Sequence, residues 1–164
     1  MTRFARRLVK AFFLTAAIPV AAIPAPASPT LTLATAQRMV STCAGFAGAQ
    51  KMPPLSIVVL DVSGTLVAFA RQDGASPASA EVALRKARSA LQARVPTSAL
   101  AKAAQDAPTR DGLIALGLLS IPGGIPFPAG APVPLGAVGV SGADPATDER
   151  CAGAAVAAFQ AAER

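Results

Sequence analysis

The chain has 164 residues, a length that suits one domain, and a formal net charge of +6 at pH 7. It contains no histidine, which excludes a Ser-His-Asp or Cys-His catalytic site and removes the commonest protein ligand of metal ions. It also lacks tyrosine and tryptophan for base stacking and has no long basic run beyond its first segment, which argues against nucleic-acid binding.

The first segment has the parts of a secretory signal peptide. Four basic residues within positions 1–10 precede an apolar stretch over 11–22, and Ala25-Pro26-Ala27 offers the small residues that a signal peptidase reads. We expect cleavage after Ala27, with Ala22 as the second choice and an uncleaved N-terminal anchor as the alternative. The apolar stretch is shorter than the ~20 residues of a spanning helix. The expected mature domain, 28–164, is therefore periplasmic or secreted without a membrane span, and its formal charge falls to +2.

The first half of the expected domain predicts a helix and a hairpin. Apolar residues recur at three- and four-residue steps over 32–50, where Thr32 can cap a helix and the following Pro53-Pro54 must end it. The stretches 56–60 and 65–71 are typical of strands, and the Asp-Val-Ser-Gly sequence between them favours a turn. These two stretches therefore predict an antiparallel hairpin.

The second half alternates helices with short strands. Ser76-Pro77 is typical of a helix start, and an alanine-rich stripe predicts that this helix continues to about Arg94. A short helix over 97–104 follows, and then a polar, turn-rich stretch over 105–112. Strands are predicted over 117–121, 125–127 and 135–141. A last helix is predicted to begin at the Asp-Pro step at 144. Helices at both ends of a series of about five antiparallel strands predict an α+β domain.

The two cysteines lie on the first and last predicted helices. Export to an oxidising compartment would permit a disulfide between Cys43 and Cys151, provided that these helices are neighbours. The alternative is two buried free thiols that act as small apolar side chains.

A few polar and glycine residues could bind a small anion. Arg71, Lys86 and Arg88 can bind a carboxylate through their charged donors, and the alternative is that they lie on a solvated helix or strand face. The sequence Pro122-Gly123-Gly124 could present backbone amides to an anion, but it lacks the Lys-Ser/Thr of a nucleotide-phosphate loop. Its alternative role is that of a simple turn.

The acidic residues give weaker indications. Asp144, Asp148 and Glu149 could bind a hard cation, although a helix start with its preferred negative charges is the favoured explanation. Asp61 could act as a base, and its alternative role is to cap the hairpin turn. We therefore assign no metal ligand and no catalytic residue.

Several stretches of the chain resemble the GlcG/HbpS family of haem-binding-like proteins. They read LTLATAQRMVSTCAGFA, VVLDVSGTLVAFARQDGASPASAEVALRKARSAL, PGGIPF, GAVGVSGA and DERCAGAAVAAF, and they extend from Leu31 to Phe159. Their common order over nearly the whole expected mature chain makes the resemblance specific. It implies a profilin-like fold, in which helices flank a curved antiparallel sheet, and assembly into homo-oligomers.

The resemblance also implies haem as a ligand and a threonine that contacts it. The family's Pro-Thr step after the second helix matches Pro96-Thr97, whereas the aromatic-Gly-Arg step that commonly precedes it is replaced by the residues 92–95. Because histidine and tyrosine are absent, only Met39, Met52 and the two cysteines remain as soft ligands for haem iron.

We interpret the chain as an exported small-molecule-binding protein that acts as a homo-oligomer, with haem as the ligand that the family suggests. The residues expected near the ligand are Arg71, Lys86, Thr97, Gly123 and Gly124. One alternative is an enzyme or accessory protein acting on small hydroxy or keto acids, which the family's gene neighbourhoods suggest. The other is a structural module that binds a protein partner.

Overall fold

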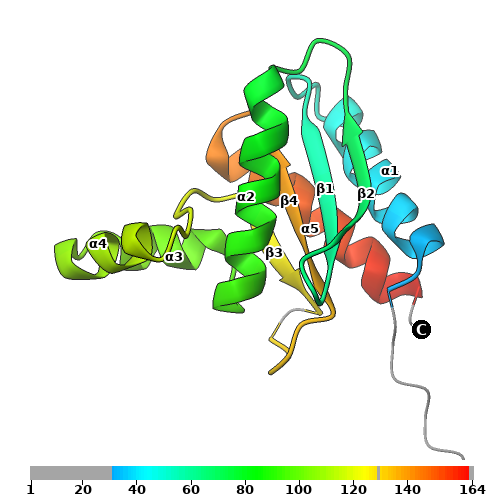
Figure 1. The fold of residues 1–164 in the computed structure, drawn as a ribbon. Helices are drawn as coiled ribbons and strands as arrows, with labels where there is room; N and C mark the ends of the chain where they lie inside the picture. The colour runs from blue at the N-terminus through cyan, green and yellow to red at the C-terminus, as the bar shows by residue number, and fades with distance from the viewer. Residues whose placement is uncertain (1–30, 129, 163–164) are drawn as a thin grey trace, which may run out of the picture.

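A four-stranded antiparallel sheet forms the centre of the fold, and helices cover both of its faces (Figure 1). The computed structural model describes residues 31–128 and 130–162. The expected signal peptide, 1–27, lies outside the described residues. In chain order the elements are α1 (Leu33–Ala49), β1 (Ser56–Asp61), β2 (Leu66–Arg71), α2 (Pro77–Ala93), α3 (Thr97–Ala103), α4 (Ala107–Ala115), β3 (Gly124–Phe127), β4 (Gly136–Ser141) and α5 (Pro145–Ala162).

The strand order in the sheet is β2-β1-β4-β3, so the central pair joins strands from the two halves of the chain. Strand β1 pairs with β2 through the predicted hairpin, and Val58 lies opposite Phe69. On its other side Val58 lies opposite Gly139 of β4. Because side chains alternate along a strand, β1 contributes Ile57 and Val59 to one face and Val58 and Leu60 to the other.

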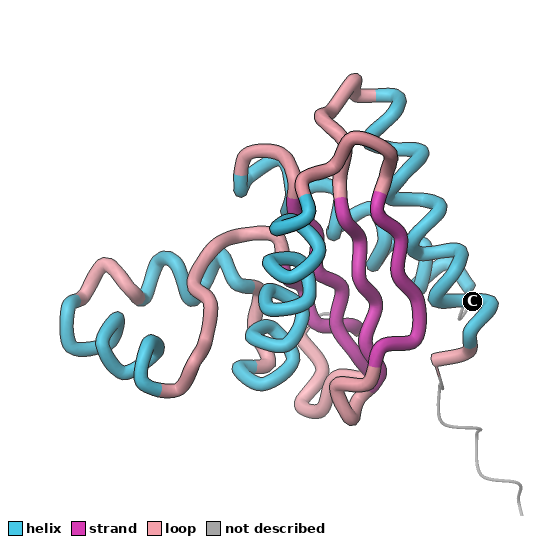
Figure 2. Tube along the Cα trace, turned by 45° about the horizontal axis from the view of Figure 1, so that its top comes forward, coloured by secondary structure: helices cyan, strands magenta, loops and turns pink. Residues whose placement is uncertain are grey.

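Helices α1 and α5 lie side by side on the first face of the sheet, as Figures 1 and 2 show. The Thr32 hydroxyl accepts a hydrogen bond from the Thr35 amide and so caps α1, as the sequence predicted. A disulfide joins Cys43 of α1 to Cys151 of α5, with 4.9 Å between the Cα atoms, and both cysteines are fully buried. The first and last helices are therefore neighbours, which is the arrangement that the predicted disulfide requires.

Helix α2 covers the second face and lies unusually close to β4. A side chain on Gly139 would overlap the carbonyl oxygen of Ala83 and come within 2.8 Å of the Ala87 nitrogen. The buried face of α2 is made of small residues, chiefly Ala83, Ala87 and Ala90, which permit this approach. The absence of a side chain at Gly139 therefore permits the close packing of α2 on β4.

The predicted α+β class is confirmed, with four strands in place of about five. The turn expected at 105–112 was wrong because helix α4 occupies most of that stretch, and the strand expected at 117–121 was wrong because those residues form an irregular segment after the helix. Asp106 caps α4 by accepting the Thr109 amide at 3.0 Å. After the helix, Gly117 has a φ of +70° and the Leu119 amide donates to the Ser89 hydroxyl at 2.7 Å. The apolar residues 117–121 are therefore held against α2 by the Ser89 side chain and pair with no strand.

Helices α3 and α4 project from the rest of the domain, as both views show (Figures 1 and 2). We call residues 97–116, which end at the C-cap of α4, the arm. Thr97 and Leu100 anchor its first helix, whereas no residue of α4 is buried. Among the described residues, no helix is long and apolar enough to span a membrane.

The close contact between α2 and β4 predicts opposite effects for two glycine substitutions. Gly139→Ala should lower the free energy of unfolding by about 1–3 kcal/mol, because its methyl group would overlap the Ala83 backbone. Gly153→Ala is the control: apart from the neighbouring backbone of α5, no atom lies within 4 Å of the added methyl group, and alanine should stabilise helix α5 by about 0.5–1 kcal/mol. Urea denaturation of both variants tests this, and a neutral Gly139→Ala would contradict the packing described.

Candidate functional site

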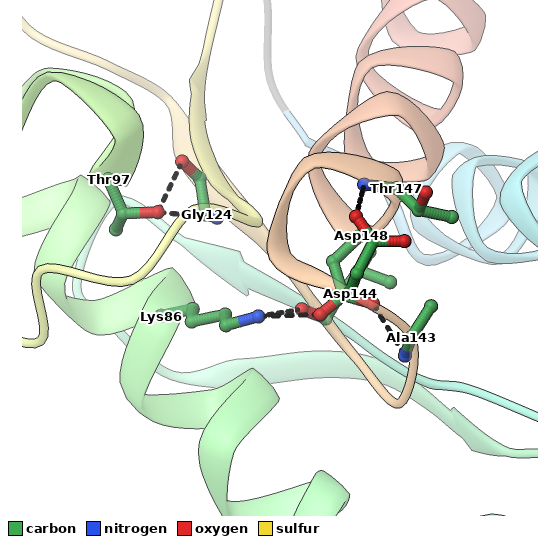
Figure 3. Close-up of polar contacts among 8 residues, drawn as sticks. Lys86, Thr97, Gly124, Ala143, Asp144, Thr147 and Asp148 are labelled. Carbon is green, nitrogen blue, oxygen red and sulfur yellow. Dashed lines mark hydrogen bonds and ion pairs between the residues drawn. The ribbon is translucent and has the colours of Figure 1, made fainter. Parts of the chain in front are cut away.

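The structure brings four of the five predicted ligand residues together. Lys86 of α2, Thr97 of α3 and the glycines 123–124 meet where α2 crosses the sheet (Figure 3). Arg71 lies apart from them, because it ends β2 at the opposite edge of the sheet. Its Nε donates to the Ala75 carbonyl at 3.0 Å and so holds the turn that leads into α2.

Lys86 is buried and forms an ion pair inside the protein. Its Nζ lies 2.7 Å from Asp148 Oδ2, each side chain is 2% exposed, and the same ammonium donates to the Val140 carbonyl at 3.0 Å. The other carboxylate oxygen of Asp148 accepts the Ala143 amide at 3.0 Å. The predicted alternative of a solvated helix face is wrong for Lys86, which links α2 to β4 and α5.

The environment of the Asp148 carboxyl has opposing effects on its ionisation. Burial raises its pKa, while the hydrogen bond and the charge of Lys86 and the Ala143 amide act in the opposite direction. Among the described residues, no buried side-chain nitrogen or oxygen lacks a hydrogen-bond partner. Each charged atom of the pair therefore has a hydrogen-bond partner, which is the condition under which buried charges are tolerated.

Thr97 and the two glycines complete this packing. The Thr97 hydroxyl accepts the Gly124 amide at 2.9 Å and donates to the Gly124 carbonyl at 3.4 Å. Gly123 has a φ of +122°, and a side chain there would come within 2.8 Å of Lys86 Nζ. Together with Lys86 and Asp148 we call these residues the Lys86 cluster. They are buried and hold one another, so the structure gives them a structural role and their predicted ligand contacts stay a prediction.

The other acidic candidates also make local contacts. Asp61 Oδ1 accepts the amides of Ser63 and Thr65 at 2.8 and 2.9 Å, which is the turn-capping role that the sequence allowed. Asp144 caps α5, and hydrogen bonding by Thr147 lowers the pKa of its carboxyl. Within 31–128 and 130–162 no group of three or more histidine, cysteine, aspartate or glutamate side chains is placed to hold a metal ion.

A groove of about 500 Å³ lies at the C-terminal end of α2, beside the β1–β2 turn. We call it the α2 groove. Its lining consists of Val62, Ser63 and Gly64 of the turn, Arg88, Leu91 and Gln92 of α2, and Arg94, Val133 and Pro134. The lining mixes apolar side chains with two arginines and contains no carboxylate. No residue of the Lys86 cluster lines it.

The two arginines of the groove are held differently. Arg88 is exposed, whereas Arg94 donates from Nη1 to the Pro132 carbonyl at 2.9 Å. Arg94 has a φ of +58°, a left-handed conformation that ends α2 and directs the chain away from the helix. Neither guanidinium forms an ion pair within the described part of the chain. The groove therefore carries two positive charges that no carboxylate neutralises.

The residues that could coordinate haem iron do not meet in this groove. Met39 is fully buried in the core, and both cysteines are consumed in the disulfide. Met52 is half-buried beside Pro54, in a smaller hollow at the end of α1. The Thr97 hydroxyl is fully buried and bonded to Gly124. The residues present thus suit the carboxylates and the apolar ring of a haem, but they do not supply an axial ligand in the groove.

Comparison with known proteins identifies related sequences and structures. The profile of the family described as haem degrading protein HbpS-like matches residues 31–157. No curated protein matches the chain. The fold is similar to a double mutant of HbpS from Streptomyces reticuli, with 36% identity, a TM-score of 0.70, and coverage of 87% of this chain and 97% of that one.

Two further structures extend the comparison. Protein ORFY of Klebsiella pneumoniae, a DUF336 protein, has 26% identity and a TM-score of 0.71, with 87% of this chain and 99% of that chain covered. PduOC, solved as a complex with haem, has 21% identity and a TM-score of 0.69 over 79% of this chain and 95% of that one. At that identity, the likeness to PduOC concerns the fold alone.

The buried ion pair predicts a strongly non-additive pair of substitutions. Lys86→Met leaves the Asp148 carboxylate without its cation and should lower the free energy of unfolding by about 3–5 kcal/mol. Adding Asp148→Asn, which keeps an acceptor for the Ala143 amide, should restore much of that loss. Exposed Arg85→Met is the control, expected within about 0.5 kcal/mol of the parent. Denaturation at pH 7 measures all four proteins, and a double variant no more stable than Lys86→Met would refute the coupling.

Proposed function

The chain belongs to the HbpS-like family of haem-degrading proteins, and on this basis we propose that it binds haem or a closely related tetrapyrrole in the α2 groove. The observation that carries the proposal is the pair of unneutralised arginines, Arg88 and Arg94, beside apolar walls. A tetrapyrrole of the haem type combines a flat apolar ring with carboxylates at its edge. The groove offers a matching surface for each part.

The size and the apolar lining of the groove support this ligand class. Its volume of about 500 Å³ lies in the range of small-molecule and cofactor sites, ~300–1,000 Å³. Leu91 and Val133 present apolar surface, and Val133 is 58% exposed. Burying such surface against a ring would favour binding through the hydrophobic effect.

The two guanidinium groups account for the polar part of recognition. A guanidinium offers a planar fork of donors that matches a carboxylate, and the exposed Arg88 guanidinium forms no ion pair among the described residues. Arg94 already uses one nitrogen on Pro132, which orients the side chain and leaves its remaining donors for a ligand. The groove is therefore suited to anionic ligands over neutral ones.

Export is part of the proposal, with the periplasm or the medium as the destination. The basic and apolar segments of 1–27 and the small residues before Ser28 have the pattern of a cleaved signal peptide. The Cys43–Cys151 disulfide suits an oxidising compartment.

We also propose that the protein is a homo-oligomer, and the arm is the feature that supports this. Ile114 and Leu116 are 67% and 73% exposed, and an isolated helix as short as α4 is marginal in water. A second apolar surface lies on the same chain, where exposed Leu66 and Phe69 border a hollow of about 180 Å³ beside α2. The arm of one copy packing on this surface of another would cover both.

Hemin titration tests the proposed ligand site. The parent protein should bind hemin saturably, and Arg88→Met with Arg94→Met should weaken binding at least about tenfold, because each removes a charge-assisted hydrogen bond. Arg85→Met is the matched control, since Arg85 lies one turn earlier on α2, exposed and outside the groove. Absence of both a Soret shift and a hemin-dependent thermal shift in the parent protein would reject the proposal.

Native mass spectrometry of protein exported by its own host tests the proposed signal cleavage and the proposed self-association. The subunit mass should correspond to a chain that begins at Ser28, and the assembly should be a whole multiple of it. The double substitution Ile114→Glu and Leu116→Glu should yield smaller assemblies, while Gln105→Glu, also exposed on the arm, should not. A monomeric parent protein would refute self-association, and an unprocessed subunit would refute cleavage.

A further inference from the structure

We infer that the α2 groove recognises the carboxylates and the apolar ring of a tetrapyrrole and not its metal, so that a metal-free porphyrin dicarboxylate is as good a ligand as haem. This inference rests on the proposed function and deepens it by naming the class of ligand. It predicts a site in which iron contributes nothing measurable to affinity.

The first support is the set of polar atoms in the groove. Besides the two arginines, which are permanently protonated, its polar side chains are Ser63 and Gln92. Their neutral hydroxyl and amide are not among the imidazole, thiolate, thioether and phenolate ligands that hold haem iron. Within the groove, therefore, no side chain is suited to fix a ligand through its metal.

The second support is the place of the residue that the family resemblance would assign to haem contact. Thr97 has no exposed surface, and its hydroxyl bonds to both the amide and the carbonyl of Gly124. Releasing it would break the Lys86 cluster, in which Gly124 packs against the Lys86 backbone. In this fold, Thr97 is held away from any ligand in the groove.

The third support is positive and concerns charge. Arg88 and Arg94 line the groove, and no acidic residue lines it with them. They therefore attract anionic groups whether or not the ligand contains a metal. The apolar residues between and beside them, chiefly Leu91 and Val133, contact a ring equally well with or without a metal. Affinity should therefore depend on the edge and the faces of the ligand.

A series of ligands separates these contributions in the full-length protein. Metal-free protoporphyrin IX, followed by its fluorescence, should bind with a Kd within about threefold of that for hemin, and hemin should displace it competitively. Hemin dimethyl ester, which keeps the iron and loses both charges, should bind at least about tenfold more weakly. The difference in affinity between hemin and its dimethyl ester should shrink in Arg88→Met and persist in Arg85→Met.

A spectroscopic readout tests the metal directly. If no protein side chain occupies an axial position, excess imidazole should shift the Soret band of bound hemin without releasing it from the protein. Failure of imidazole to alter the band would indicate a protein ligand and would overturn the inference.

The outcomes distinguish this inference from the proposed function. Tight binding of hemin with more than about tenfold weaker binding of protoporphyrin IX would overturn the inference and leave haem binding intact. Undiminished binding of the dimethyl ester would also overturn it, because the arginines would then contribute nothing. Binding of neither porphyrin would refute the proposed function itself.

Discussion

The buried ion pair between Lys86 and Asp148 is the contact on which the placement of α2 depends. It joins α2 to α5 across β4, through residues that are 62 positions apart. Gly139 and Gly124 allow the helix to come close enough for this contact, since a side chain at either would overlap the α2 backbone. The next turn of the same helix carries Arg88 and Leu91. Their position relative to the β1–β2 turn, and hence the shape of the α2 groove, is therefore set by a cluster that does not line it.

Local signals in the sequence were sufficient for most of the secondary structure. Thr32 begins α1 and Pro77 begins α2 as expected, and the turn at Asp61 lies between two paired strands. The misplaced strand at 117–121 shows the limit of such signals, because a short apolar run has the same composition in a strand as in a covered loop. The two structures differ in the hydrogen-bond partner of the backbone. Here the Leu119 amide donates to the Ser89 hydroxyl and not to a neighbouring strand.

The candidate site was less predictable because it depends on contacts between distant residues. One signal for the burial of Lys86 was present: it lies three residues after Ala83 and four before Ala90, on the buried stripe of α2. Its partner could not be identified, since the negative charge of Asp148 was attributed to a helix start. Arg88 was considered as a carboxylate ligand, whereas Arg94 and Val133 line the groove where α2 ends in a left-handed turn and Arg94 donates to the Pro132 carbonyl.

The family resemblance and the proposed ligand chemistry rest on different parts of the molecule. The stretches that carry the resemblance include Gly123, Gly124, Asp148 and Cys151, which hold the helices on the sheet. Arg94 and Val133 lie outside those stretches, and Arg94 falls within the segment where the chain departs from the family pattern. Relatives can therefore share this fold and differ at the groove. A lineage that lacks an iron ligand can retain the ring and carboxylate contacts, and its ligand would then be selected by shape and charge. The same groove would accept porphyrins at any stage of metal insertion or loss.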